Sequence, residues 1–76
     1  MSEQKERIQA VFAAILKRPV GADEEIARDN ETGWDSLKHM ELVFALEEEF
    51  GIEFTEEDIA RIDSRAAFAA RIAELT

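Results

Sequence analysis

The sequence predicts an all-α fold, a small four-helix bundle with a long loop between the first two helices and a short third helix. Apolar residues recur at helical spacing in separate stretches, and residues that commonly cap helices stand at the ends of these stretches. No sustained alternation of apolar and polar residues indicates a strand. A chain of 76 residues has room for one compact domain, residues 1–76.

The first helix is expected from about residue 4 to residue 17. One face of this stretch is apolar, formed by Ile8, Val11, Phe12, Ile15 and Leu16. The helix should end there because Pro19 disfavours helical geometry at Arg18 and Gly21 follows soon after. Residues 18–34 then form a long loop, in which Ile26 is the one strong apolar anchor.

The second helix should open at Asp35-Ser36, both favoured N-cap types, and end before Gly51, a suitable C′ glycine. Thr55 and Asp58 have the spacing of a capping box and predict the short third helix. Asp63-Ser64 predicts the start of the fourth, whose apolar face contains Ala67, Phe68, Ile72 and Leu75.

The second helix carries two apolar stripes. One stripe is expected to face the core and consists of His39, Leu42, Val43, Leu46 and Phe50. The nearly opposite stripe consists of Leu37, Met40 and Phe44, flanked by Glu41, Glu47 and Glu48. This second stripe is either buried by another helix or exposed for a partner protein. We favour a docking surface, because burying the flanking glutamates would be costly.

The charge of the chain restricts its partners. Eighteen acidic residues against nine Lys and Arg give a formal net charge of −9, and residues 35–58 alone hold nine acids and one Lys. Such a chain would be repelled by nucleic acid and by anionic membranes, so basic partner proteins are expected. The sequence contains no targeting signal or membrane-spanning stretch, which predicts a cytoplasmic protein without membrane insertion. We expect a monomer.

Metal and catalytic chemistry are not expected. There is no cysteine and only one histidine, and the acidic loop lacks the glycine and glutamate that a calcium-binding EF-hand requires. Ser36 has Asp35 and His39 nearby, but no glycine-rich nucleophile elbow accompanies them. A hydrolase is therefore the weakest hypothesis, and no catalytic residue is predicted.

One stretch resembles a known family. Gly33-Trp34-Asp35-Ser36-Leu37, followed by Glu41-Leu42-Val43, Leu46-Glu47-Glu48-Glu49-Phe50-Gly51 and Ile52, is similar to the acyl carrier proteins. The resemblance extends over the whole chain, in length, acidity, helix order and the long first loop. It implies that Ser36, between Asp35 and Leu37, receives a 4′-phosphopantetheine arm from a phosphopantetheinyl transferase. The thiol of the arm would carry acyl or aminoacyl groups as thioesters. Ser64 is expected only to cap a helix.

The resemblance also implies a cargo pocket and a set of partners. A long acyl chain would lie among Leu46, Phe54, Ile59, Ile62 and Phe68. The partners would be acyl-loading, acyl-transfer or condensing enzymes that have basic docking patches, so the chain would be a non-catalytic carrier of lipid metabolism. Trp34, Lys38 and His39 depart from many fatty acid biosynthesis carriers and favour a specialised acyl pathway. The alternative is a small acidic interaction domain that is never modified.

Overall fold

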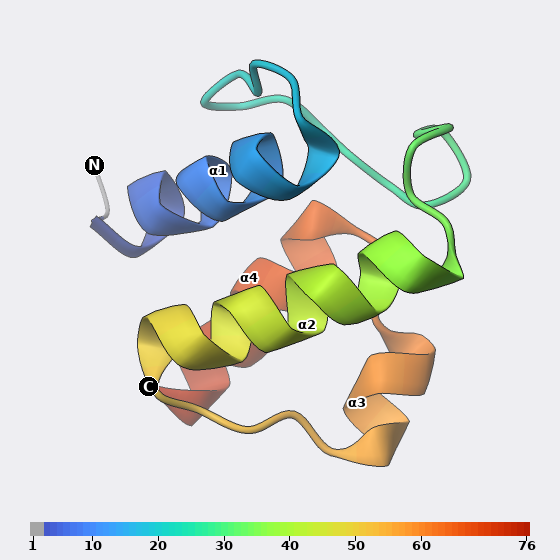
Figure 1. Ribbon diagram of the computed structural model, residues 1–76. Helices are drawn as coiled ribbons and strands as arrows, with labels where there is room; N and C mark the ends of the chain where they lie inside the picture. The colour runs from blue at the N-terminus through green and yellow to red at the C-terminus, as the bar shows by residue number, and fades with distance from the viewer. Residues whose placement is uncertain (1–2) are drawn as a thin grey trace.

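Four helices make up the regular structure of the computed structural model, which describes residues 3–76. They are α1 (Glu3–Leu16), α2 (Ser36–Phe50), α3 (Glu56–Arg61) and α4 (Arg65–Leu75), as Figure 1 shows. Within these residues there is no strand, and a single antiparallel bridge joins Ala27 to Ser64. The prediction of an all-α fold with a long first loop and a short third helix is confirmed.

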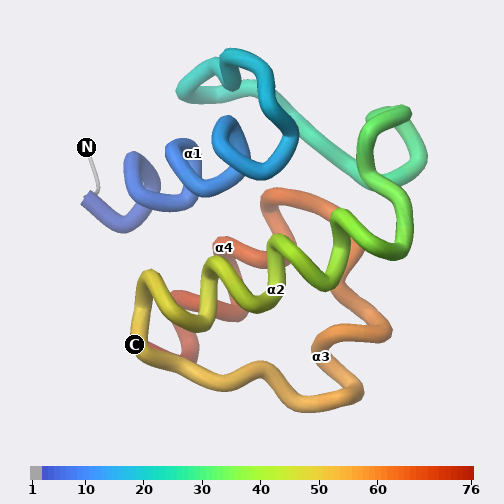
Figure 2. The backbone as a smooth tube through the Cα atoms, in the orientation of Figure 1, coloured from blue at the N-terminus to red at the C-terminus, as the bar shows by residue number. Residues whose placement is uncertain are grey.

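The helices are arranged around α2. The tube in Figure 2 shows α1 and α2 running in opposite directions, and these two helices pack against each other. α4 crosses behind α2, where Phe68 of α4 meets Phe12 of α1 with ring centroids 6.0 Å apart. α3 lies on the side of α2 away from α1 and is tied to it by a hydrogen bond between His39 and the carbonyl of Ile59.

The predicted caps are present. Asp35 accepts a hydrogen bond from the backbone N–H of Lys38, and Gly51 ends α2 in the left-handed conformation, with φ of 64°. A side chain at that φ would be strained, which explains the glycine. Thr55 and Asp58 form the reciprocal capping box of α3. Ser64 accepts from the N–H of Ala67 and caps α4.

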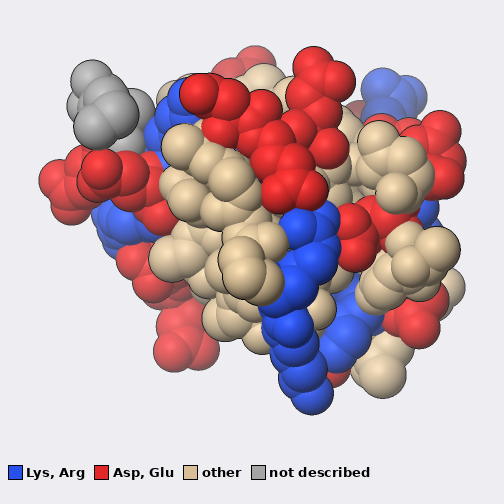
Figure 3. All heavy atoms as spheres, turned by 90° about the horizontal axis from the view of Figure 1, so that it is seen from above, with Lys and Arg blue, Asp and Glu red and all other residues tan. Residues whose placement is uncertain are grey.

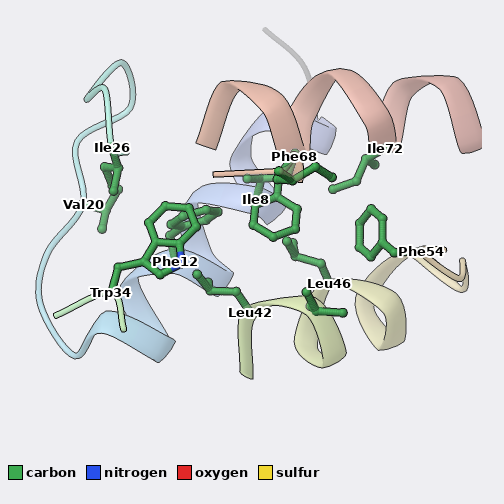
Figure 4. Packing of buried hydrophobic residues seen from close by; sticks show 12 residues of the cluster. Ile8, Phe12, Val20, Ile26, Trp34, Leu42, Leu46, Phe54, Phe68 and Ile72 are labelled. Atoms are coloured by element: carbon green, nitrogen blue, oxygen red, sulfur yellow. The ribbon is translucent and has the colours of Figure 1, made fainter. Parts of the chain in front are cut away.

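The core is an aromatic and aliphatic cluster centred on Phe68, whose side chain is fully buried. Its ring lies 5.6 Å from Phe54, 6.0 Å from Phe12 and 6.1 Å from Trp34, measured between centroids, and Figure 4 shows these rings converging between the helices. The predicted core stripe of α2 is buried except for Phe50, which is half-buried at the edge of the cluster, under the guanidinium of Arg7.

The long loop is anchored more extensively than the sequence predicts. Ile26 is buried as expected, but Val20 and Trp34 are buried as well, so the prediction of one strong anchor is wrong. The reason is the aromatic cluster, because the ring of Trp34 packs against both Phe12 and Phe68. The loop therefore contributes to the core at both of its ends and its middle.

The buried Arg65 holds the loop from the other side. Its guanidinium donates hydrogen bonds of 2.8–3.1 Å to the backbone carbonyls of Gly21, Ala22 and Glu24. Backbone hydrogen bonds from Arg28 to Asp63 and from Arg65 to Ile26 add to this contact. The loop is thereby fixed on the junction between α3 and α4.

Candidate attachment site at the start of helix α2

Ser36 is the first residue of α2 and is exposed to solvent. Asp35 before it has extended backbone geometry and directs its carboxylate at the N–H of Lys38, 2.9 Å away. Since Asp35 supplies the cap, the Ser36 hydroxyl is not needed to satisfy the orphan amides of the first turn. The two serines of the Asp-Ser pairs thus differ, because Ser64 uses its own hydroxyl as the cap of α4.

Arg28 brings a positive charge to Ser36 from the long loop. Its Nη2 donates a hydrogen bond of 3.1 Å to Ser36 Oγ. The backbone of Arg28 is held by the hydrogen bond of 2.8 Å from its N–H to the carbonyl of Asp63, and Arg28 lies within the turn that runs from Ala27 to Asn30. The sequence alone does not reveal a role for Arg28, because seven positions of irregular loop lie between it and Ser36 and no local pattern signals the contact.

Trp34 and His39 support the start of α2 from inside. Trp34 Nε1 donates to His39 Nδ1 over 3.0 Å, and His39 Nε2 lies 2.7 Å from the carbonyl of Ile59. Because Nδ1 accepts, the proton of the neutral ring is on Nε2 and is donated to that carbonyl. Both ring nitrogens are therefore in use within the core, and His39 is not positioned to take a proton from Ser36. This geometry argues against a hydrolase.

The outer stripe of α2 has the exposure expected of a docking surface. Leu37 and Phe44 are 66% and 60% exposed, and they are the two large apolar residues that are exposed among residues 3–76. Met40, which lies between them, is half-buried. Within residues 3–76 no other helix covers Leu37 and Phe44, so the interpretation that another helix buries the stripe is wrong for these two residues. A partner that covers them would come from another molecule.

The three flanking glutamates have different environments. Glu41 pairs with Lys38 at 3.1 Å, and Glu48 is exposed. The carboxylate of Glu47, by contrast, accepts a hydrogen bond of 2.8 Å from the backbone N–H of Phe54. Glu47 therefore stabilises the chain that follows α2 through one of its carboxylate oxygens.

The acyl-pocket residues lie together but are closely packed. Leu46, Phe54 and Phe68 are buried in the same cluster (Figure 4). Ile62 is buried in it as well, and Ile59 is half-buried against it. Two hollows on the described residues lie elsewhere. One of about 620 Å³ lies between α1, loop residues 22–30 and the start of α4. Another, of about 330 Å³, lies between α1 and α2.

Charge is distributed unevenly over the surface. Figure 3 views the molecule from the side of α1 and the long loop, where Lys and Arg side chains run between the acidic ones. Several of these charges pair locally. Hydrogen bonds from Arg18, and then from the N–H of Gly21, lower the pKa of Glu24, and Lys5 lowers the pKa of Asp23. These pairs tie the loop to the end and the face of α1 and do not include Ser36.

Two further classes of site are absent from the described residues. Among residues 3–76 no group of three or more His, Cys, Asp or Glu is arranged to hold a metal ion. No helix in that range is both long and apolar enough to cross a bilayer. The start of α2 instead has the exposed hydroxyl of Ser36 with the guanidinium of Arg28 beside it. A hydroxyl next to a guanidinium is a suitable place for a phosphate ester.

Two comparisons with known proteins agree with this geometry. Residues 6–72 match the family described as "Phosphopantetheine attachment site". The chain is also similar to a protein of Ralstonia nicotianae called "Acyl carrier protein 3", with 36% identity over 62 residues, which cover 78% of this chain and 69% of that protein.

Proposed function

The chain belongs to the family of phosphopantetheine-dependent acyl carrier proteins, and from this premise we propose that Ser36 is the residue that carries the arm. Membership of the family establishes the carrier role and a covalently attached 4′-phosphopantetheine group. The choice of Ser36 is supported by its exposure at the start of α2 and by its place in the Asp-Ser-Leu sequence. Its hydroxyl is left available by the cap that Asp35 supplies.

Loading would transfer the arm from coenzyme A to the hydroxyl of Ser36. Ser36 Oγ forms an ester bond to the phosphorus that carries pantetheine in coenzyme A, the P–O bond to adenosine bisphosphate breaks, and the hydroxyl proton is released. The chain has no cysteine, so a thioester requires the thiol of the attached arm. The protein then acts as a carrier, while the reactions on the cargo are performed by its partner enzymes.

Mass spectrometry tests the assignment. The protein is incubated with coenzyme A, magnesium and a phosphopantetheinyl transferase, and we expect one added phosphopantetheine group on the peptide containing Ser36. Ser36→Ala should accept none, whereas Ser64→Ala, which removes the serine of the second Asp-Ser pair, should be loaded normally. Loading of Ser36→Ala would refute the assignment. Absence of any loading in the parent protein would instead favour an unmodified acidic interaction domain.

We further propose that partner enzymes dock on the outer surface of α2, formed by Leu37, Met40, Phe44, Glu41 and Glu48. Two exposed apolar side chains next to carboxylates fit a partner with an apolar pocket and a basic rim. The surface begins one residue after Ser36, so a docked enzyme would have the arm within reach. Glu47 is better assigned to the fold, because the N–H of Phe54 occupies its carboxylate.

Three residues depart from the pattern of many fatty acid carriers, and the structure gives them two different environments. Trp34 and His39 hydrogen-bond to each other inside the protein, so their identity is explained by packing. Lys38 lies at the edge of the docking surface, where it places a positive charge beside Glu41. We propose that Lys38 selects among partner enzymes and that the carrier serves a specialised acyl pathway, in which a subset of basic partners is excluded by this charge.

A further inference from the structure

We propose that Arg28 binds the phosphate of the prosthetic arm and thereby holds the arm against the long loop. The inference rests on the attachment to Ser36 proposed above. It concerns a residue outside the Asp-Ser-Leu sequence, located in a loop that no sequence pattern connects with the arm.

The position of Arg28 is determined by the fold. Its backbone N–H bonds to the carbonyl of Asp63 at 2.8 Å, and its neighbour Ala27 forms a bridge with Ser64. From this fixed backbone the side chain reaches the start of α2, where Nη2 lies 3.1 Å from Ser36 Oγ. The guanidinium is therefore within hydrogen-bond distance of the atom that would become the ester oxygen.

The charge of Arg28 is uncompensated within the described part of the chain. Of the six arginines, four form ion pairs with carboxylates, namely Arg7, Arg18, Arg61 and Arg71. Arg65 is buried on three backbone carbonyls. Arg28 differs from these five, because among residues 3–76 its side chain bonds to a neutral hydroxyl and to no acid. In a chain with 18 acidic residues this lack of a carboxylate partner is unusual.

A phosphate on Ser36 would supply the missing anion. Esterification replaces the hydroxyl proton with phosphorus, and the two non-bridging oxygens carry the negative charge one bond further out. A guanidinium offers several N–H donors in one plane, which suits two oxygens of a phosphate better than a single hydroxyl. The contact would also reduce the repulsion between the phosphate and Asp35, the exposed neighbour that caps α2. The first segment of the arm would then lie toward the loop.

The experiment compares the holo and apo forms of four proteins, namely the parent, Arg28→Gln, Arg28→Lys and Arg7→Gln. Arg7→Gln is the matched control, since it removes the same charge at the far end of α2, where Arg7 pairs with Glu49. At a rise of 1.5 Å per residue that end is about 20 Å from Ser36. The readouts are the phosphorus NMR resonance of the attached arm and the difference in Tm between the holo and apo forms.

At low salt we expect the difference in Tm between the holo and apo forms to be about 1–5 °C larger in the parent protein than in Arg28→Gln. The phosphorus resonance should move in Arg28→Gln toward that of free phosphopantetheine, stay in place in Arg7→Gln and be intermediate in Arg28→Lys. Added salt should reduce the Tm difference.

Two outcomes would count against the proposal in different ways. If Ser36 is loaded but the resonance and the Tm difference are the same in Arg28→Gln as in the parent, the role of Arg28 is refuted and the attachment site stands. If the mass of the parent does not increase, the attachment at Ser36 fails, and the inference about Arg28 fails with it.

Discussion

The indole of Trp34 and the imidazole of His39 form a buried pair at the start of α2. Trp34 Nε1 donates to His39 Nδ1 over 3.0 Å, and the two rings stack with their centroids 5.9 Å apart. The last residues of the loop and the first turn of α2 are thereby joined. Ser36 lies between these two residues in the sequence, so the pair holds both ends of the short segment that contains it.

Replacing one member of the pair should destabilise the protein by more than the lost packing alone. His39→Phe leaves the indole N–H of Trp34 without an acceptor, which we expect to cost about 1–3 kcal/mol in the free energy of unfolding. Trp34→Phe leaves His39 Nδ1 without its donor. Urea denaturation of both single variants and of the double variant measures the coupling. Strictly additive losses would show that the hydrogen bond contributes nothing.

Leu46 and Phe44 lie on opposite faces of α2 and should respond differently to truncation. Leu46 is fully buried, so Leu46→Ala should cost about 2–5 kcal/mol in stability. Phe44 is 60% exposed, so Phe44→Ala should change stability by less than about 0.5 kcal/mol. If Phe44 is an interface anchor, the kcat/KM of a phosphopantetheinyl transferase for this variant should fall about fivefold or more. If Phe44→Ala is loaded at the rate of the parent protein, Phe44 is not part of the docking surface.

The neighbouring residues Glu47 and Glu48 are expected to have different roles, Glu47 in stability and Glu48 in docking. Glu47→Ala removes the acceptor of the Phe54 N–H and should lower stability by about 1–3 kcal/mol. Glu48→Ala should leave stability unchanged and slow transferase loading at low ionic strength, with a smaller effect as salt screens the charge. The comparison uses urea denaturation and loading rates on the same two variants. A loss of stability in Glu48→Ala would contradict the division of roles.

Asp58 should make α3 sensitive to acid. The backbone N–H of Thr55, followed by the guanidinium of Arg71, lowers the pKa of Asp58 below its ordinary value of about 4. Since the folded-state pKa is the lower one, the stabilisation is complete above pH 4 or so and is lost as the pH falls through the folded value. Asp58→Asn should therefore give a flatter dependence of stability on pH below about 4 than the parent protein.

Glu57→Gln is the control for this comparison. Its carboxylate is on the same helix and forms an exposed ion pair with Arg61, at 3.5 Å. Thermal unfolding between about pH 2 and pH 6 checks the expectation. If Asp58→Asn and the parent show parallel curves, the capping carboxylate of α3 does not contribute to acid unfolding.

The sequence by itself was sufficient for the features of this protein that depend on near neighbours. The caps at Asp35, Thr55 and Ser64 act within three residues, and Gly51 ends α2 through its own backbone geometry. The two stripes of α2 follow from helical spacing alone, and they separate its buried face from its exposed one. The resemblance to the acyl carrier proteins identified the family for the same reason, because its motif is contiguous.

The tertiary structure decided which polar groups meet across the chain. Arg65 is 41 to 44 residues from the loop carbonyls that it holds, and Arg28 reaches Ser36 from eight positions earlier, across irregular chain. Glu47 appears on the sequence as one more acid of the docking surface until the backbone of Phe54 is placed beside it. Such contacts have no period in the sequence, since they depend on how a loop without regular structure folds back onto the helices. The charge that Arg28 places beside Ser36 is one of them.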